Sequence, residues 1–291
     1  MEPMTMGLLT AGAAALSAPV TKLIEVVSAG MGRAYEPLHL VRLARAEAKA
    51  LSIMAHGAAD VQNIETRAAR RVAATEVWRQ ENLEAIAELA VNALPDQVSA
   101  VPVARDWVAR FFEHCKDASN QDMRQLWARL LAGEVTRPNS FSLRTLALVA
   151  QLSAPEANDF NVLCLRCVQV DDSWVPFLRR MNSDYLAASG LTYNAVTRLE
   201  AAGLVQYTNA DLLQRVVLEV EEGTRLTTRS GKSFHFAVPA GAEAAIPMGT
   251  LALSPSGEEL APLAAGPENI EYLEEEVFAP LRDLGWTVLA S

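Results

Sequence analysis

The sequence predicts a mainly α-helical protein, in which long N-terminal helices precede a small α+β domain at the C-terminus. Three observations carry this prediction. Alanine, the strongest helix former, is abundant, while aromatic residues make up only 6% of the chain. The stretch 38–94 contains no proline and a single glycine. After about residue 170, short β-rich runs alternate with turns rich in glycine and polar residues.

The stretch 38–94 predicts two long helices that meet near Gly57. In the second helix, Ile64, Ala68 and Val72 recur at helical spacing and form a narrow apolar stripe. A narrow stripe on a long helix usually packs against another helix, in the same chain or in a second copy. We therefore predict a homo-oligomer. The charged residues of this helix fall off the stripe and are interpreted as a solvated face: Arg67, Arg70, Arg71, Arg79, Glu81 and Glu84.

Further helices are predicted over Val103–Cys115, Gln121–Val135 and Leu143–Leu152, and from Ala154 toward Val170. Residues with short polar side chains precede two of them, Ser119 or Asn120 in one case and Ser140 or Ser142 in the other. Such side chains accept hydrogen bonds from the free backbone N–H groups of a first turn, so we expect them to cap these helices.

The C-terminal domain combines both kinds of element. Expected strands are Val216–Val220, Phe234–Val238, Gly249–Leu253 and Trp286–Leu289, and expected helices are Tyr193–Ala202, Ser254–Leu263 and 268–284. The helix end at Leu199 to Val205 and the turn Ser254–Gly257 match the outline of a winged helix. Its candidate recognition helix offers one cation, Arg198, whereas specific duplex binders bring several. A winged-helix transcriptional regulator is therefore an alternative function and not the leading one.

The charge of the chain is distributed unevenly. Residues 201–291 hold 5 basic and 13 acidic side chains, within a net charge of −10 for all 291 residues. A strongly negative domain repels a phosphate backbone, so nucleic acid is disfavoured as a partner. The length suggests about two domains. We predict an N-terminal hydrophobic or amphipathic segment (1–34), a helical domain (35–170) and an acidic α+β domain (171–291).

Residues 3–21 carry no charge, but they are rich in small residues and contain Pro19. A membrane-spanning helix needs ~20 predominantly apolar residues, so a packed terminal helix is favoured over a span. A membrane-active effector that uses residues 3–31 is kept as an alternative. The segment lacks the basic start of a secretory signal, and an odd number of cysteines fits a reducing compartment. We expect a cytoplasmic protein, with membrane association as the alternative.

No motif nominates a catalytic residue, a cofactor or a metal. The phosphate-binding patterns GxxxxGK[ST] and GxGxxG are absent, as are GxSxG and HExxH. Cys164 and Cys167 form a CxxC pair, but a structural zinc ion needs four ligands and only Cys115 is left to add. The three cysteines are therefore interpreted as buried free thiols, and a non-enzymatic protein is favoured over an enzyme.

One central segment has a familiar pattern. The run from Met123 to Glu134 (MRQLWARLLAGE), followed by Pro138 to Leu146 and Ala157 to Phe160, resembles bacterial proteins grouped as domain of unknown function 2806. It is more loosely similar to the abortive-infection alpha proteins. Tyr35-Glu36-Pro37, the Arg79–Asn82 run and Asp106-Trp107 extend the resemblance to roughly residues 20–165. It implies a helix-rich bacterial protein, with phage defence as a setting through the looser kinship, and it transfers no catalytic residue.

Five residues of this region are structural or interaction candidates: Trp107, Trp127, Glu134, Arg144 and Phe160. Trp127 lies on a wide apolar helix face and is interpreted as core. For Glu134, capping or salt bridging is favoured over catalysis. Glu134 and Arg144 are candidates for an ion pair that joins two helices.

Overall fold

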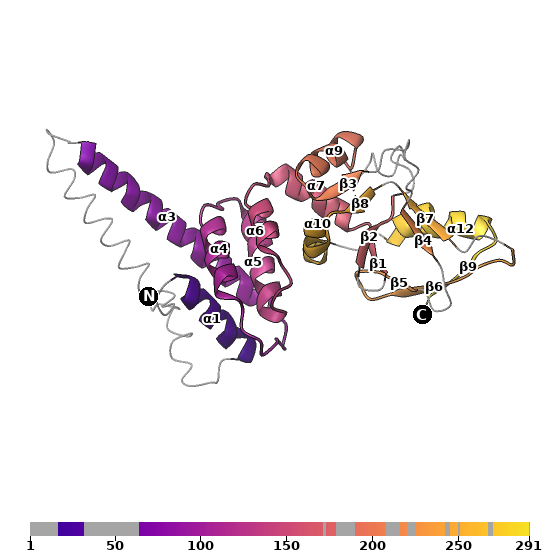
Figure 1. The fold of residues 1–291 in the computed structure, drawn as a ribbon, viewed down its shortest axis with the longest axis horizontal. Coiled ribbons are helices and arrows are strands. Elements are labelled where there is room, and N and C mark those ends of the chain that lie inside the picture. Colours follow the sequence, from indigo (N-terminus) through magenta and orange to yellow (C-terminus); the bar gives the residue numbers. More distant parts are fainter. Residues whose placement is uncertain are drawn as a thin grey trace, which may run out of the picture. The chain divides into compact units, whose positions relative to one another are not determined.

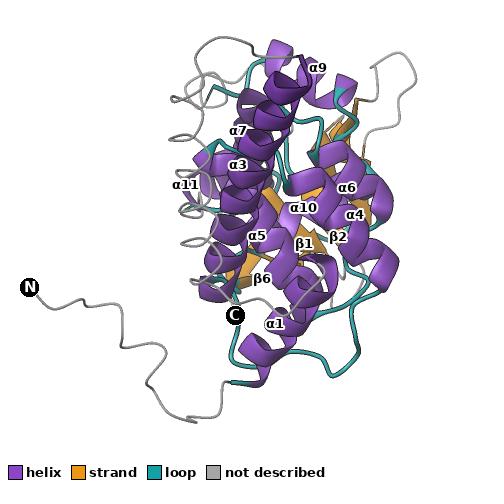
Figure 2. Cartoon of the chain, turned by 90° about the vertical axis from the view of Figure 1, so that its left-hand side faces the viewer, coloured by secondary structure: helices purple, strands orange, loops and turns teal. Residues whose placement is uncertain are grey.

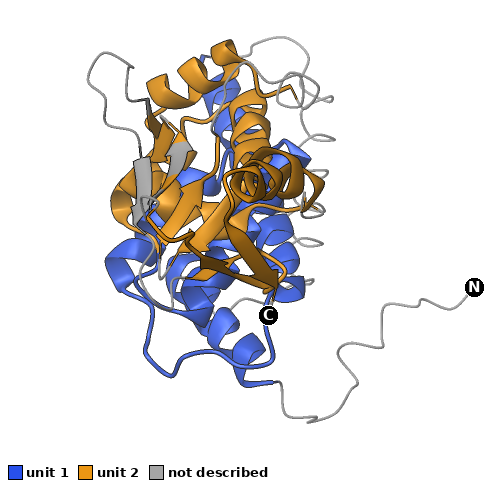
Figure 3. Cartoon of the chain, turned by 90° about the vertical axis from the view of Figure 1, so that its right-hand side faces the viewer, with its two compact units in different colours: residues 1–140 blue, residues 141–291 orange. Residues whose placement is uncertain are grey.

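The computed structural model describes residues 17–31, 64–170, 173–178, 190–207, 216–219, 225–241, 245–249, 251–266 and 270–290. The chain divides into two compact units, residues 1–140 and residues 141–291 (Figure 3). All described secondary structure of the first unit is helical, whereas the second unit contains helices and strands (Figures 1 and 2). The predicted class, mainly α with an α+β part toward the C-terminus, is confirmed.

The described helices of the first unit are α1 (Ala18–Met31), α3 (Ile64–Asn92), α4 (Arg105–Cys115) and α5 (Gln121–Thr136). Helix α5 is central, because both α1 and α3 pack against it. Its apolar face, with Leu130 and Leu131 fully buried, forms the core of the unit. The side chain of Asn120 accepts from the backbone N–H groups of Asp122 and Met123, so the predicted cap of α5 is confirmed.

Helix α1 belongs to this core. Its residues Leu23, Val26 and Val27 are buried, and it packs against α4 and α5. A Cβ atom at Gly30 would collide with the ring of Phe112, so glycine allows the close approach of α1 and α4. No helix within the described ranges is both long and apolar enough to cross a bilayer. The rest of the predicted segment 1–34 lies outside the described residues.

The described helices of the second unit are α6 (Leu143–Val149), α7 (Ala154–Cys164), α9 (Tyr193–Ala201), α10 (Pro255–Leu260), the 3-10 turn η2 (Ala261–Leu263), α11 (Ile270–Leu273), the π-helical turn η3 (Glu274–Phe278) and α12 (Ala279–Asp283). Helix α6 packs against α10, and α7 packs against α9. The two compact units divide at residue 140, and the predicted division into a helical domain (35–170) and an acidic α+β domain (171–291) stays a prediction. Helices α6 and α7 lie with the C-terminal elements because their packing partners are there.

The described strands all lie in the second unit: β1 (Cys167–Val170), β2 (Ser173–Pro176), β3 (Val205–Tyr207), β4 (Val216–Glu219), β5 (Arg225–Thr227), β6 (Ser233–Ala237), β7 (Ala245–Gly249), β8 (Leu251–Leu253) and β9 (Thr287–Ala290). Five of them form an antiparallel sheet in the order β2-β1-β5-β6-β9. Strands β3 and β8 form a second antiparallel pair, and β4 and β7 a third.

The helix predicted from Ala154 toward Val170 is too long. It ends at Cys164, and β1 follows, with Val168 opposite Val175 and Val170 opposite Ser173 of β2. Valines favour a strand when such cross-strand partners exist, and the pairing with β2 and β5 overrides the local helical pattern.

One face of the five-stranded sheet packs against the acidic C-terminal helices. The rings of Phe234 and Phe236 lie on this face, with centroids 4.6 and 6.4 Å from that of Phe278. The hydroxyl of Tyr272 on α11 donates to the backbone carbonyl of Phe177. The apolar side of the stretch α11–η3–α12 is thereby buried, and its charged side faces outward.

Gly257 of α10 gives the first testable prediction. A Cβ atom there would overlap the backbone carbonyl oxygen of Leu204, which cannot rotate away. Gly257→Ala should therefore lower the free energy of unfolding by about 1–3 kcal/mol, measured by urea denaturation. Glu258→Ala, on the exposed side of the same helix, is the control and should change it by less than about 0.5 kcal/mol. Equal stability of both variants would contradict the close approach.

Candidate functional site

The apolar stripe predicted on α3 is buried over one half of the helix and uncovered over the other. Ile86 and Ala90 have no exposed surface. By contrast, Ile64 is 72% exposed and Val72 is 56% exposed. Trp78 is also exposed, and α3 carries more exposed large apolar side chains than any other described element. This unequal burial makes α3 the candidate functional element.

The buried and uncovered parts belong to one face of α3. From Val72 the stripe continues through Thr75 and Arg79 to Asn82, and then to Ile86 and Ala90, in steps of three and four residues. Arg79, predicted to fall off the stripe, therefore lies on it. Residues at this spacing lie above one another on a helix. The surface that packs on α5 therefore extends without a break into the exposed N-terminal half.

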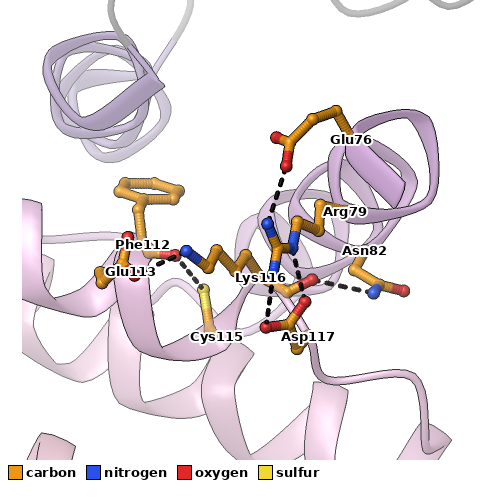
Figure 4. A network of polar contacts seen from close by, with 8 residues as sticks. All are labelled: Glu76, Arg79, Asn82, Phe112, Glu113, Cys115, Lys116 and Asp117. Atoms are coloured by element: carbon orange, nitrogen blue, oxygen red, sulfur yellow. Dashed lines mark hydrogen bonds and ion pairs between the residues drawn. The ribbon is translucent and has the colours of Figure 1, made fainter. Parts of the chain in front are cut away.

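Asn82 holds the stripe at the point where its buried part begins. Its side chain is fully buried, and its amide nitrogen donates to the backbone carbonyl of Lys116 at a distance of 2.9 Å (Figure 4). Its amide oxygen accepts from the guanidinium of Arg124 on α5. A buried amide without partners costs about 1–3 kcal/mol, so these two bonds fix the register of α3 on α4 and α5.

Arg79 makes a second attachment one turn earlier. Its Nε and Nη2 atoms donate to the two carboxylate oxygens of Asp117, at 2.7 and 3.2 Å, and its Nη1 donates to Glu76 at 2.7 Å (Figure 4). A two-pronged contact between guanidinium and carboxylate adds geometric specificity to the charge attraction. Together with Asn82 it clamps α3 to the C-terminal end of α4.

Glu134 forms a separate polar site at the end of α5. The carboxylate is buried and accepts from the backbone N–H groups of Asn139, at 2.7 Å, and Ser140, at 3.1 Å. Asn139 has φ of 69°, a conformation in which no other non-glycine residue of the described ranges is found. Asparagine tolerates this region better than most residues. Glu134 therefore holds the tight turn that follows α5.

Lys22 of α1 lies close to this turn. Its Nζ atom donates to the backbone carbonyls of Ser99 and Val135, at 2.7 and 2.8 Å. Burial lowers the pKa of Lys22, and the nearby carboxylates of Glu134 and Glu25 oppose that shift. A cation at the last carbonyls of a helix is favourable. The contact ties α1 to the C-terminal end of α5.

Two of the five predicted site residues meet in the core of the first unit. Trp107 stacks on Phe111 with ring centroids 5.1 Å apart, and Trp127 meets the same ring edge to face at 5.4 Å. All three side chains are buried. The tryptophans therefore form an aromatic cluster that holds α4 on α5.

The remaining candidates are divided between the units. Phe160 is buried on α7, and Arg144 is exposed on α6, both in the second unit. An ion pair between Glu134 and Arg144 would join the two units and stays a prediction.

A family model covers most of this chain. Residues 66–276, which span parts of both units, match the model described as "Protein of unknown function (DUF2806)". The chain belongs to the DUF2806 family. This confirms the resemblance of the segment around Trp127. No curated protein and no solved structure matches the chain at a significant level.

The thiols of this DUF2806 protein are buried, as the sequence predicts. Cys115, Cys164 and Cys167 are free cysteines, and burial raises the pKa of the thiols of Cys115 and Cys164. Cys167 donates to the backbone carbonyl of Leu163 at 3.7 Å. Within the part of the chain that the structure describes, no group of three or more His, Cys, Asp or Glu side chains could hold a metal ion.

Sequence reasoning overlooked Asn82, Lys22 and Asp117. The signal for Asn82 was present, because it occupies a position on the apolar stripe between Thr75 and Ile86. A polar residue in such a row indicates a buried hydrogen bond. No comparable signal exists for Lys22 and Asp117, since their partners are distant in the sequence.

Glu134 can be tested by removing its carboxylate. Glu134→Ala takes the acceptor from two backbone N–H groups and should lower the free energy of unfolding by about 1–3 kcal/mol. Glu134→Gln keeps one oxygen and should cost less. Urea denaturation measures both, with the exposed Asp96→Ala as the control. Full stability of Glu134→Ala would show that the turn does not depend on this side chain.

The cysteines provide a second test of the structure. Burial shields all three thiols from solvent, and in Cys115 and Cys164 it also disfavours the thiolate, which is the reactive form. All three should therefore resist an aromatic disulfide reagent at pH 8 in the native protein. The same reagent should label all three once guanidinium chloride unfolds the chain. Labelling of the native protein as fast as of the unfolded protein contradicts the burial.

Proposed function

We propose that this DUF2806 protein is a non-enzymatic interaction protein that self-associates through the uncovered stripe of α3. The uncovered stripe is the row Ile64, Ala68, Val72 and Thr75, in which Ile64 and Val72 are exposed and Ala68 and Thr75 are half-buried. The observation that carries the proposal is the exposure of Ile64 and Val72 on the same helix face that is buried farther along α3.

The physical argument rests on apolar surface. Full burial of a side chain such as Ile or Val contributes about 1.5–3 kcal/mol. The described residues 64–76 extend over about 20 Å of helix, which is enough for a helix of a second copy to lie along them. Association also costs several kcal/mol in lost translational and rotational freedom, so we expect two copies to associate at micromolar concentrations of the protein.

The setting that we propose for this self-association is phage defence. It is supported by the looser resemblance of the segment around Trp127 to the abortive-infection alpha proteins. The membrane alternative gains no support from α1, because the apolar side chains Leu23, Val26 and Val27 are buried within the first unit.

We also propose that part of the second unit is a winged-helix-like arrangement. Its support is the packing of α7 on α9 and the antiparallel pair β3–β8 that follows. Ser254 closes this pair, because its hydroxyl donates to the carbonyl of Gly203. DNA contact is not favoured, since Arg198 of α9 forms an ion pair with Asp159 of α7.

Self-association is tested by placing charge on the stripe. The variant Ile64→Lys/Val72→Lys should be a monomer of about 31.5 kDa, because burying a lysine at the contact costs more than the apolar gain. The control Thr66→Lys/Ala73→Lys adds the same charge on the exposed opposite side of α3 and should associate like the wild type. Light scattering after size exclusion gives the masses.

Circular dichroism should show that both variants remain folded, since all four positions lie outside the buried half of α3. A wild-type chain that is monomeric across the micromolar range overturns the proposed function.

A further inference from the structure

The uncovered stripe has a basic border. Arg67, Arg70 and Arg71 are exposed, and Arg67 and Arg71 follow Ile64 by three and seven residues. At this helical spacing Arg67 and Arg71 form a row directly beside the row of Ile64 and Val72, and Arg70 lies farther around the helix. None of the three arginines forms an ion pair with a residue of the described ranges. A partner that covers the stripe must also face Arg67 and Arg71.

A second α3 that runs in the opposite direction is a poor partner for such a surface. If two uncovered stripes paired with each other in opposite directions, the arginine rows of both copies would flank the same side of the contact. Like charges at flanking positions oppose the pairing of two helices. The stripe instead fits a surface that presents acids beside an apolar side chain.

The helical stretch α11–η3–α12 carries exposed acids and ends at an exposed apolar side chain. Glu271, Glu274 and Glu275 are exposed on α11 and the π-helical turn η3 that follows it. Leu284 lies at the end of the same helical stretch and is 65% exposed. Arg282 pairs with Glu274, whereas Glu271 and Glu275 form no ion pair with a described residue. We name the residues Glu271, Glu274, Glu275 and Leu284 the acidic surface.

We infer that the uncovered stripe of one copy docks on the acidic surface of a second copy. The inference rests on the proposed self-association and specifies which surface is the partner. The contact joins two different surfaces, and each copy carries both the uncovered stripe and the acidic surface. Such contacts form rings when the rotation closes and open chains when it does not. Attraction between exposed charges is screened by salt, so the association should weaken as ionic strength rises.

Two charge-reversal variants test the inference. The basic row is reversed in Arg67→Glu/Arg70→Glu/Arg71→Glu, and the acidic surface in Glu271→Lys/Glu275→Lys. Each variant alone should associate at least about tenfold more weakly than the wild type, because like charges then meet at the contact. The control Glu88→Lys/Asp96→Lys changes net charge as much as the acidic-surface variant, at exposed positions away from both surfaces, and should behave like the wild type.

Mixing the two variants gives the decisive measurement. One variant retains an intact acidic surface and the other an intact stripe, and their two reversed surfaces also carry opposite charges, so together they should form complexes of at least twice 31.5 kDa. A chain that carries both reversals should regain self-association. Circular dichroism of each variant checks that the fold is kept, and light scattering gives the masses.

The outcomes separate the two proposals. If Glu271→Lys/Glu275→Lys associates like the wild type while Ile64→Lys/Val72→Lys is monomeric, the acidic surface is not the partner and the proposed self-association stands. A mixture that stays monomeric also overturns the docking inference. If the lysine variant of the stripe associates normally as well, the proposed function itself fails.

Discussion

A mismatch in length between two packed helices constrains the first unit. Helix α3 has 29 residues and α5 has 16, which corresponds to about 44 and 24 Å of helix. The apolar stripe runs along nearly all of the longer helix, so α5 cannot cover it all. The uncovered row from Ile64 to Thr75 follows from this mismatch, and every functional argument about α3 depends on it.

The hydrogen bonds that Asn82 and Arg79 make with the end of α4 decide which part of the stripe is covered. Apolar rows alone would let α3 slide along α5 by one helical turn at a modest cost, because one small aliphatic side chain replaces another. Asn82 prevents this, since a shift by one turn would separate its amide from Lys116 and Arg124. Buried polar groups of this kind fix the register of paired helices. The uncovered stripe is therefore a defined surface and not an average over several registers of α3 on α5.

The sequence reveals periodic features and leaves out the contacts that connect distant residues. The stripe through Ile64 and Val72 follows from local spacing, but its exposure depends on where α5 ends. In β1, Val168 and Val170 were predicted to be helical, because the pairing with β2 and β5 is not visible in the local pattern. Glu134 was recognised as a capping candidate. The turn that it holds could not be identified, because every residue except proline has a backbone N–H group and the sequence does not show which ones a carboxylate binds.

The uneven charge of the chain has a consequence for assembly. The basic row at Arg67–Arg71 belongs to the first unit, whereas the acidic surface and most of the excess acids belong to the second. In the proposed docking of the uncovered stripe on the acidic surface, one of each surface is left unoccupied in any open assembly, so further copies add at both ends. Growth continues until a ring closes or the concentration falls below the dissociation constant. In this arrangement, the size of the assembly depends on the concentration of the chain.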